Sequence, residues 1–471
     1  MADAKPRTLG ELKAAGYKVR PVKDEMRRNL IEKIRREEVI FPGIIGYEDS
    51  VLPQIENAIL SGQDIILLGE RGQGKSRLIR SLVNLLDEET PIIAGSELFD
   101  DPYNPISKMA RELVAEKGDA TPIDWVHRSR RYGEKLATPD ITIADLIGEV
   151  DPIKVAEGRY LSDELTIHYG LIPRTNRGIF CINELPDLAE RIQVGLLNIL
   201  EERDVQIRGY RIQLPLDVFF VASANPEDYT NRGRIITPLK DRCGSEIRTH
   251  YPRTNALEIE IMDQERYRFD EDEIKASSPN FMKEVVAEVT QLARRSPDIN
   301  QRSGVSVRVS IANYENTISN AVKRSIRTDE TTAAPRVSDL PSIVASMAGK
   351  IELEATDDGR EEHVIDKLTQ SAILNVFNRN ASLQDLEPMV AYFDQGNSIE
   401  VSEAMRSSDY MQAAGKVPGL LEHARTLAGS DDPAVIASAI EFILEGLHLN
   451  RKLNKDKVTG RSQYRGHHGL L

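Results

Sequence analysis

The chain has 471 residues, of which 29% are charged and 40% hydrophobic, and its formal net charge at pH 7 is −14. No apolar run approaches the roughly 20 residues that span a bilayer, and the N-terminus lacks the apolar core of a secretory signal. The acidic balance argues against a general nucleic-acid-binding protein, which needs a basic face to displace counterions. Only Cys181 and Cys243 are present, too few for a disulfide framework or a zinc site. We therefore expect a globular cytoplasmic protein.

Residues 1–40 are expected to form a helical arm that ends at the Phe-Pro-Gly sequence of 41–43. From there to residue 254, short apolar runs alternate with amphipathic stretches. The runs lie at 64–68, 178–182 and 217–223. Short β runs with helices between them indicate a parallel sheet covered on both faces. We therefore predict an α/β domain over 41–254.

Helical patterns replace strand patterns after residue 254 and continue to the end of the chain. We predict an all-α lid at 255–330 and a helical C-terminal extension at 331–471. Near the end, Asp432 is placed to cap a helix that begins at Pro433. The predicted fold is therefore α/β, a parallel sheet followed by two helical parts.

Several other features have ordinary structural interpretations. Residues 26–38 are locally basic and predict a solvated helix face, whereas the basic tail at 450–468 predicts a frayed terminus. Each cysteine is expected to be a small buried residue. The histidines are scattered without metal-ligand spacing, so we assign them no catalytic or metal role.

Residues 69–76 match the pattern G-x-x-x-x-G-K-[ST] between an apolar run and an amphipathic stretch. Glycines allow backbone N–H groups to surround a phosphate, and the helix that follows points its positive end at the same group. We expect Lys75 to neutralise the β- and γ-phosphates and Ser76 to ligate Mg²⁺, which makes ATP and Mg²⁺ the predicted cofactors. The predicted nucleotide-binding residues of this loop are Gly69, Glu70, Arg71, Gly72, Gln73, Gly74, Lys75 and Ser76.

Glu184 directly follows the apolar run at 178–182, at the end of a predicted buried strand. A carboxylate in that place can orient and deprotonate the water that attacks the γ-phosphate. The residue before it, Asn183, stands where an aspartate is usual. We predict that Asn183 lies near Mg²⁺ and turns its NH₂ group away from the metal, toward Ser76 or a strand carbonyl.

In four further stretches the sequence resembles the AAA+ ATPases, and in particular the branch of the magnesium chelatase I subunit and the MoxR-like ATPases. Residues 41–51 resemble the segment that lies over the adenine, which implies contacts from Ile45 and Gly46. Residues 223–229 resemble the sensor 1 motif, which implies that Asn225 is the sensor.

The third stretch, 239–244, resembles the segment that carries an arginine finger, which maps to Arg242. The fourth, 303–310, resembles the sensor 2 segment, which maps to Arg308. The assignment to the chelatase branch rests on an insertion and on a hairpin around Val205–Leu214. The resemblance covers about residues 41–322.

The resemblance implies a homo-oligomeric ring of six subunits that uses ATP hydrolysis to remodel a partner protein. The partner would be a separate polypeptide, either a chelatase subunit or a protein with a von Willebrand A domain. One alternative is an enhancer-dependent transcription activator, although the chain lacks that family's sigma-factor loop motif. Another alternative, motivated by Asn183, is a nucleotide-gated scaffold with little turnover. Membrane and nucleic acid are not expected partners.

Overall fold

The computed structural model describes residues 5–151, 166–201, 204–206, 213–226, 233–268, 274–354, 360–458 and 461–467. The chain divides into two compact units, Met1–His250 and Tyr251–Leu471. The finer division into an arm, an α/β domain, a lid and an extension stays a prediction. No helix in the described part of the chain combines the length and the hydropathy that a bilayer span requires.

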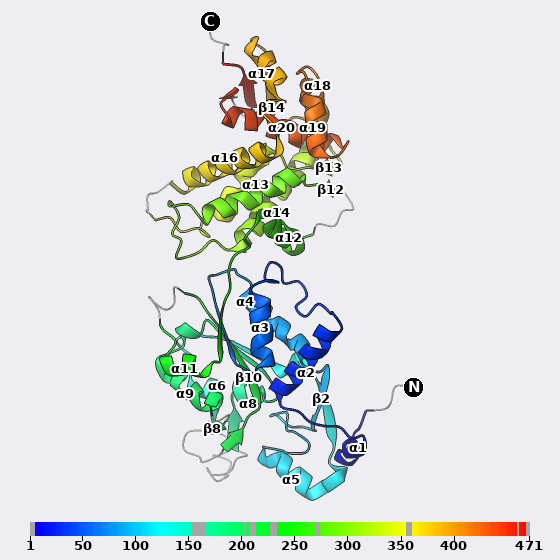
Figure 1. Ribbon diagram of the computed structural model, residues 1–471, viewed down its shortest axis with the longest axis vertical. Coiled ribbons are helices and arrows are strands. Elements are labelled where there is room, and N and C mark those ends of the chain that lie inside the picture. Colours follow the sequence, from blue (N-terminus) through cyan, green and yellow to red (C-terminus); the bar gives the residue numbers. More distant parts are fainter. Residues whose placement is uncertain are drawn as a thin grey trace. The chain divides into compact units, whose positions relative to one another are not determined.

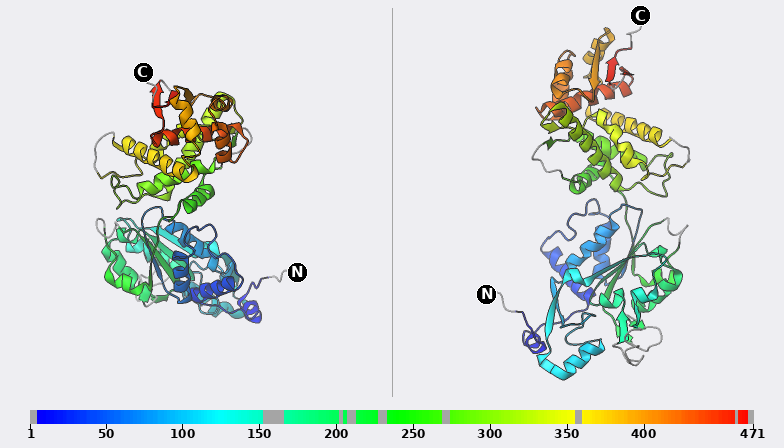
Figure 2. Two further views of the ribbon diagram at one scale, coloured as in Figure 1. Left: turned by 45° about the horizontal axis from the view of Figure 1, so that its top comes forward. Right: turned by 180° about the vertical axis from the view of Figure 1, so that it is seen from behind.

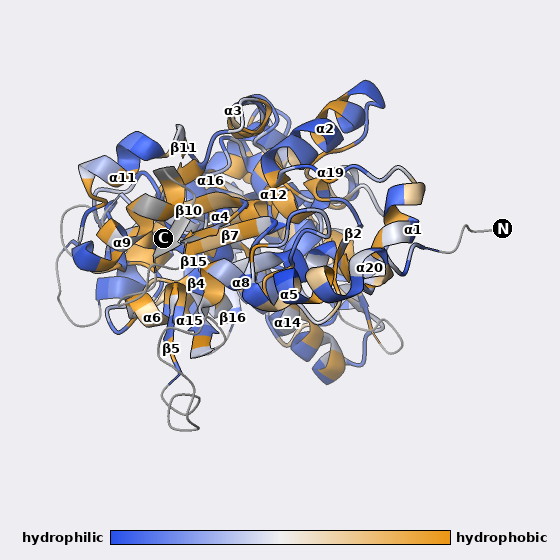
Figure 3. Cartoon of the chain, turned by 90° about the horizontal axis from the view of Figure 1, so that it is seen from below, coloured by the Kyte–Doolittle hydropathy of each residue, from blue (hydrophilic) through white to orange (hydrophobic). Residues whose placement is uncertain are grey.

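A five-stranded parallel sheet forms the centre of the first unit (Figure 1). Its strand order is β11-β1-β10-β7-β4. Its strands are β1 (Ile65–Leu68), β4 (Tyr132–Leu136), β7 (Gly178–Asn183), β10 (Val218–Ala224) and β11 (Ser245–Arg248). Every residue of β1, β7 and β10 is buried, and β7 and β10 stand out as hydrophobic in Figure 3. Continuous apolar runs are typical of parallel strands that are covered on both faces. The predicted parallel sheet is therefore confirmed.

Helices cover both faces of this sheet (Figure 2). The helices are α2 (Val22–Arg35), α3 (Val51–Leu60), α4 (Lys75–Ser81), α9 (Glu190–Glu201) and α11 (Thr237–Arg242). The first three pack with Ile179 and Cys181 of β7, and the last two pack with Phe180 and Ile182 of the same strand. Successive strand residues point to opposite faces, so one strand contributes to both cores.

The N-terminal segment packs against the central sheet of the first unit through α2. Val22, Met26 and Leu30 are buried in the same core as β1. In addition, both guanidinium Nη atoms of Arg131 donate to the Glu25 carboxylate, at 2.8 and 2.6 Å. The basic residues of the stretch, such as Arg27 and Arg36, are exposed. The predicted helix with a solvated basic face is therefore present, and its other face is fixed to the core.

An antiparallel ribbon of β2 (Glu89–Ile93) and β3 (Ile123–His127) lies outside the central sheet. Trp125 of this ribbon donates its indole N–H to the Pro6 carbonyl at 2.9 Å. Its ring also meets the Tyr17 ring edge to face, with 5.9 Å between the centroids. The short helix α1 (Leu9–Ala14) lies between Pro6 and Tyr17 in the chain, and α5 (Lys108–Lys117) connects the two strands of the ribbon.

Two further antiparallel strand pairs complete the first unit. In one, β8 (Asp204–Gln206) pairs with β9 (Gln213–Pro215), so that Val205 lies opposite Leu214. This pairing confirms the predicted hairpin; residues 207–212 lie outside the described part. In the other, β5 (Gly148–Val150) pairs with β6 (Ile167–Tyr169), next to the short helices α6 (Ile143–Leu146) and α8 (Leu171–Arg174).

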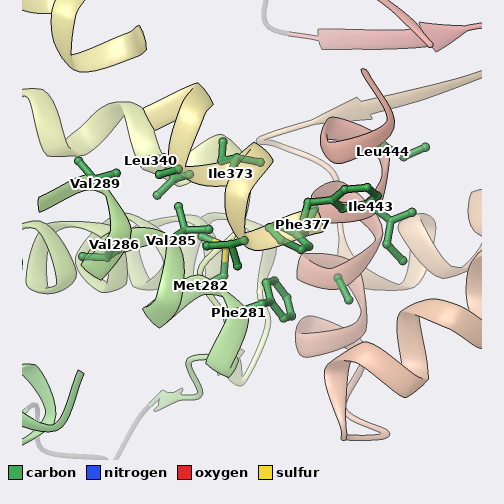
Figure 4. Close-up of a cluster of buried hydrophobic side chains, with 14 of the residues drawn as sticks. Phe281, Met282, Val285, Val286, Val289, Leu340, Ile373, Phe377, Ile443 and Leu444 are labelled. Atoms are coloured by element: carbon green, nitrogen blue, oxygen red, sulfur yellow. The ribbon is translucent and has the colours of Figure 1, made fainter. Parts of the chain in front are cut away.

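The second unit is predominantly helical, as predicted. Its helices are α12 (Asn255–Glu265), α13 (Asn280–Ala293), α14 (Val307–Thr328), α15 (Val344–Met347), α16 (Arg360–Asn380), α17 (Glu387–Asp394), α18 (Ser407–Ala414), α19 (Leu420–Ala428) and α20 (Pro433–Leu449). Phe281, Phe377 and Ile443, from three of these helices, meet in the core (Figure 4). The predicted cap is confirmed, because the Asp432 carboxylate accepts from the Ala434 N–H at 2.9 Å.

Two small sheets in the second unit were not predicted. The strands β14 (Ser398–Ser402), β15 (Asn454–Val458) and β16 (Arg461–Arg465) form an antiparallel sheet in the order β14-β16-β15. A two-residue parallel pair joins β12 (Lys275–Ala276) to β13 (Thr332–Ala333). The expected frayed terminus is therefore wrong for most of 450–468. Buried Tyr464 holds this segment by donating its hydroxyl to Glu445 of α20.

Candidate nucleotide-binding site

The loop between β1 and α4 has the backbone that its glycines permit. Gly72 and Gly74 have φ values of 73° and 75°, in the left-handed region that side chains disfavour. Gly69 is fixed for a different reason, because a Cβ atom there would overlap the side-chain oxygens of Thr249 and Gln73. Each of the three glycines therefore has its own structural reason, which argues against a chance glycine-rich turn.

Lys75 lies at the centre of this loop and is 9% exposed. Its ammonium group donates to the Gly69 carbonyl, to the Glu70 carbonyl at 2.8 Å and to Oδ1 of Asn225 at 2.8 Å. Lys75 and Asn225 are 150 residues apart in the chain. They meet because β1 and β10 are adjacent parallel strands, with Leu68 opposite Ala224. The structure thus brings the predicted phosphate-binding lysine and the predicted sensor together.

Two side chains outside the loop, those of Tyr47 and Thr249, hold Gln73 in place. The Tyr47 hydroxyl lies 2.6 Å from the Gln73 carbonyl and 2.9 Å from the His250 carbonyl. Thr249 donates to the Gln73 side chain at 2.6 Å, and Ser50 lies 2.8 Å from His250 Nε2. Burial raises the pKa of Tyr47 to about 12, against hydrogen bonds that lower it, so its hydroxyl stays a donor.

The predicted adenine segment reaches the same loop. Ile45 and Gly46 are half-buried and immediately precede Tyr47, which contacts Gln73. Gly46 has a φ of 81°, and its N–H donates to the Glu48 carboxylate at 3.1 Å. The sequence analysis included Ile45 and Gly46 but missed Tyr47 and Thr249 as supports of the loop.

A cavity of about 370 Å³ opens beside the loop. Its volume lies within the range that small-molecule sites occupy. Two cationic residues, Lys240 and Arg248, line it together with two acidic residues, Glu70 and Glu246. The other lining residues are Leu68, Gly69, Gln73, Pro226 and Thr249. The loop therefore borders a space that is lined by charged side chains of both signs and is large enough for a small molecule.

Glu184 follows β7 with a φ of 56°. A residue other than glycine in this region is uncommon, and such backbone strain is concentrated at functional sites. Its N–H donates to the Ser223 hydroxyl of β10 at 3.2 Å, which fixes the turn. The side chain is half-buried, and its carboxylate has no hydrogen-bond partner among the described residues. The Glu184 carboxylate is therefore available to accept a hydrogen bond from a water molecule.

The Asn183 side chain bridges β7, β4 and β10. Its Nδ2 donates to Glu134 of β4. Its Oδ1 accepts from the Ser223 hydroxyl at 3.1 Å and from the Cys181 thiol at 3.6 Å. We expected the amide nitrogen to point to Ser76 or to a strand carbonyl, and it contacts a carboxylate instead. That partner is invisible in the sequence because it lies 49 residues away.

Glu134 also receives hydrogen bonds from two other residues. Arg80 of α4 donates to its two oxygens at 2.8 and 3.0 Å, and the Tyr132 hydroxyl donates at 3.0 Å. Burial acts to raise the pKa of Glu134, but the donors Arg80, Tyr132 and Asn183 together hold that pKa below its ordinary value. Glu134 is therefore ionised at neutral pH. The sequence analysis missed both Glu134 and Arg80.

Both cysteines are buried and unpaired. Burial raises the pKa of Cys181 and of Cys243 to about 12, so each thiol stays protonated and unreactive. Among the residues described, no group of three or more histidine, cysteine, aspartate or glutamate side chains could hold a metal ion. Any divalent cation here would depend on hydroxyl, amide and phosphate oxygens as well as single carboxylates.

No family model matches the chain. The chain is 27% identical over 266 residues to "Magnesium-chelatase subunit ChlI" of Nostoc sp. (strain PCC 7120), covering 55% of this chain and 65% of that protein. It is 29% identical over 263 residues to the chloroplastic ChlI of Oryza sativa subsp. indica, covering 52% and 56%. The chain resembles the magnesium-chelatase I subunits. The matched part of the chain covers 65% of the first relative's length and 56% of the second relative's length.

Two solved structures that match the chain share less of its sequence than these chelatase relatives do. NtrX of Brucella abortus matches with a TM-score of 0.40 and 15% identity, over 75% of this chain and 68% of its own. A model of the complex between BchI and BchD of magnesium chelatase matches with a TM-score of 0.36 and 18% identity, over 69% and 98%. Similarity at this level carries no argument about function.

The AAA+ resemblance singled out two arginines, one in each unit of the chain. Arg242 ends α11, is half-buried and donates from Nη1 to the Pro238 carbonyl of its own helix at 3.1 Å. Arg308 belongs to the second unit, in the first turn of α14, and is exposed. The roles of both arginines in this chelatase-like chain stay predictions.

Proposed function

We propose that this protein is an AAA+ ATPase of the magnesium-chelatase type, which hydrolyses ATP in a homo-oligomeric ring. The observation that carries this proposal is the meeting of Lys75 and Asn225 at the glycine loop. The buried Lys75 ammonium group donates to two loop carbonyls and to the Asn225 amide oxygen, all of which are neutral acceptors. Phosphate oxygens would compensate it better, because charge-assisted bonds are stronger.

Each residue of the group has a defined part in this reaction. Lys75 would exchange the loop carbonyls for the β- and γ-phosphates. Oδ1 of Asn225 already accepts from Lys75, which leaves its NH₂ group to donate to the γ-phosphate or to the attacking water. Glu184 would take the proton of that water. Positioning and charge stabilisation of this kind account for most of the catalysis of phosphoryl transfer.

The oxygen donors at the loop fit Mg²⁺, which prefers hard oxygen ligands and retains several waters. Ser76 of α4 would ligate the ion, and the Asn183 amide oxygen would accept from one of its waters. Mg²⁺ would supply neutralisation of the charge on the phosphates. Glu134 is ionised and accepts a hydrogen bond from the Asn183 amide. Its negative charge therefore lies near the Asn183 amide oxygen.

The ring, its partner and its location are further parts of the proposal. The similarity to chelatase I subunits favours a motor that acts on a separate chelatase subunit or on a protein with a von Willebrand A domain, rather than a MoxR-like chaperone. Arg242 would reach the ATP of the next subunit, and Arg308 would respond to γ-phosphate loss in a lid at 255–330. The protonated, unpaired thiols of Cys181 and Cys243 support a cytoplasmic location.

Nucleotide binding by Lys75→Ala tests the core of this proposal. We expect the wild type to bind a fluorescent ATP analogue and Lys75→Ala to lose that binding. Lys33→Ala is the matched control, because Lys33 lies on α2 in a partly exposed pair with Glu38. Thermal melts without nucleotide would show that each variant is folded. Equal binding by Lys75→Ala and the wild type would overturn the proposal.

A second candidate function is a nucleotide-gated scaffold, and Asn183 is the observation that favours it. If the missing carboxylate prevents turnover, the chain would bind ATP and change its assembly without hydrolysing it. Phosphate release at saturating Mg²⁺ separates the two functions. Release above the Lys75→Ala background supports the ATPase, and its absence together with tight binding supports the scaffold.

A further inference from the structure

We infer that Glu134 is a positioning residue of the Mg²⁺ site, and that it supplies through Asn183 the negative charge that an aspartate at position 183 would carry. This inference rests on the proposed function and deepens it. It concerns two neighbouring strands, β4 and β7, and the helix α4 that covers them.

The register of the sheet places the two side chains together. β4 and β7 are parallel, with Glu134 opposite Cys181 and Leu136 opposite Asn183. Because side chains alternate along a strand, Cys181 and Asn183 point to one face. Glu134 reaches along this face to the Asn183 amide. Glu134 is paired with Cys181, two residues before Asn183. Its long side chain spans this offset along the strand.

The same face lies beneath the turn that carries the predicted metal ligand. Arg80 of α4 contacts Glu134 through two hydrogen bonds. Ser76 lies four positions before Arg80 in the same helix, so the two side chains share one helix face, one turn apart. Arg80 of α4 and Asn183 of β7 therefore contact the same carboxylate of β4, and Ser76 lies one helical turn before Arg80.

The hydrogen bonds fix which end of the amide faces which partner. The Glu134 carboxylate accepts only, so the Asn183 NH₂ group must point to it. That contact leaves Oδ1 as the acceptor for other groups, and the Ser223 hydroxyl now occupies it. A water bound to Mg²⁺ is a stronger donor than a serine hydroxyl. An anion behind the amide also polarises it, which strengthens the hydrogen bond accepted by its oxygen.

Arg80 is the counter-ion of Glu134. Its exposed position limits how much of the Glu134 charge it neutralises. The Arg80 side chain is 63% exposed, whereas that of Glu134 is 20% exposed. The positive charge is therefore more strongly screened by water than the negative charge. Tyr132 and Cys181 are neutral at physiological pH, since the pKa of each is raised. The charged group that contacts the Asn183 amide is the Glu134 carboxylate.

Exchanging the carboxylate and the amide between positions 134 and 183 tests this inference. The variants are Glu134→Gln, Asn183→Asp and the double variant Glu134→Gln/Asn183→Asp, which returns one carboxylate and one amide to the pair. The measurement is the Mg²⁺ concentration that gives half of the metal-dependent gain in affinity for a fluorescent ATP analogue. Thermal midpoints without Mg²⁺ and nucleotide are measured in parallel.

We expect Glu134→Gln to raise this Mg²⁺ concentration about tenfold, as the loss of one charge near the metal implies at an effective dielectric near 20. The double variant should return it to near the wild-type value. Asn183→Asp alone places two carboxylates in contact, so its thermal midpoint should fall without Mg²⁺ and recover with it.

The inference is overturned if Glu134→Gln and the wild type give the same Mg²⁺ concentration. It is also overturned if the double variant behaves as Glu134→Gln does, because the charge would then have no effect and the cluster would serve only to join the strands. A wild type that binds no nucleotide at any Mg²⁺ concentration overturns the proposed function itself. A wild type that binds nucleotide while Glu134→Gln leaves its Mg²⁺ response unchanged overturns only the inference.

Discussion

Glu184 combines a strained backbone with a carboxylate that has no partner among the described residues. We predict that Glu184→Gln keeps its affinity for ATP and loses hydrolysis by about 10²–10⁴-fold, because the amide can hold the water but cannot take its proton. Phosphate release and nucleotide binding measured side by side would check this. Glu190→Gln is the control, since Glu190 lies in an exposed pair with Arg234. Turnover near the wild-type rate in Glu184→Gln would assign the base elsewhere.

Gly69 permits the close approach of Thr249 and Gln73 to the loop. We predict that Gly69→Ala lowers the free energy of unfolding by about 1–3 kcal/mol, as overpacking does, and weakens nucleotide binding. Thermal denaturation would measure the first effect. Gly195→Ala is the control, because a Cβ there meets only Ile143 at 3.6 Å. A Gly69→Ala protein as stable as the wild type would show that the loop moves freely.

The glycine loop was predictable because its pattern is local. Its partners were not, because they are distant in sequence: the contact of Tyr47 with Gln73 spans 26 residues, and that of Thr249 spans 176. Glu134 was missed for the same reason. No periodicity connects a half-buried glutamate on one strand with an asparagine on the next.

The helix α2 is fixed to the first unit by the buried pair of Glu25 and Arg131. Their side chains are 6% and 1% exposed. Removing one partner of such a pair leaves an uncompensated buried charge, so we predict that Glu25→Ala costs about 3–5 kcal/mol of unfolding free energy. Chemical denaturation would measure this loss. Glu38→Ala, which removes a largely exposed partner of Lys33, should cost less than about 1 kcal/mol. Similar costs for the two variants would contradict the structural role of the pair.

The elements of the first unit were predictable because parallel strands buried on both faces leave continuous apolar runs. The sheet of β14, β15 and β16 was harder. β14 does alternate, with Ile399 and Val401 buried and their neighbours facing outward, and that signal was available. In β16, by contrast, only Tyr464 is both large and buried. Its pairing depends on tertiary contacts with α20 rather than on its own pattern.

The proposed role of Arg242 can be tested through the assembly of subunits into a ring. If it acts on the ATP of a neighbouring subunit, ring formation and hydrolysis are coupled. We predict that ATP converts the wild type from small species to a large ring in light scattering, and that Arg242→Ala lowers turnover by about 10³–10⁵-fold. The control is Arg36→Ala, since the Arg36 side chain is 67% exposed. A strictly monomeric wild type with full ATPase activity would rule out the coupling.

Glu288 is a carboxylate through which the stability of the second unit can depend on pH. Burial acts to raise its pKa, but hydrogen bonds from Asn375, Asn255 and Arg379 hold that pKa below its ordinary value of 4.5. A lowered carboxyl pKa stabilises the fold above the unfolded-state value, and this contribution is lost as the pH falls through the folded-state value. We predict that Glu288→Gln is less stable than the wild type at pH 7 and that the difference shrinks below about pH 4.5. Far-ultraviolet circular dichroism melts over this pH range would measure it. A constant difference would mean that the charge is not involved.

Trp125 is the single tryptophan of the chain, and it lies in the ribbon of the first unit, bonded to the Pro6 carbonyl and packed against Tyr17. Intrinsic tryptophan emission is therefore a probe of one unit only. Loss of the N-terminal segment would expose the indole to water and shift its emission to longer wavelength. Unfolding of the second unit would leave the signal unchanged, so that fluorescence and circular dichroism recorded on one sample would separate the melting of the two units without any label.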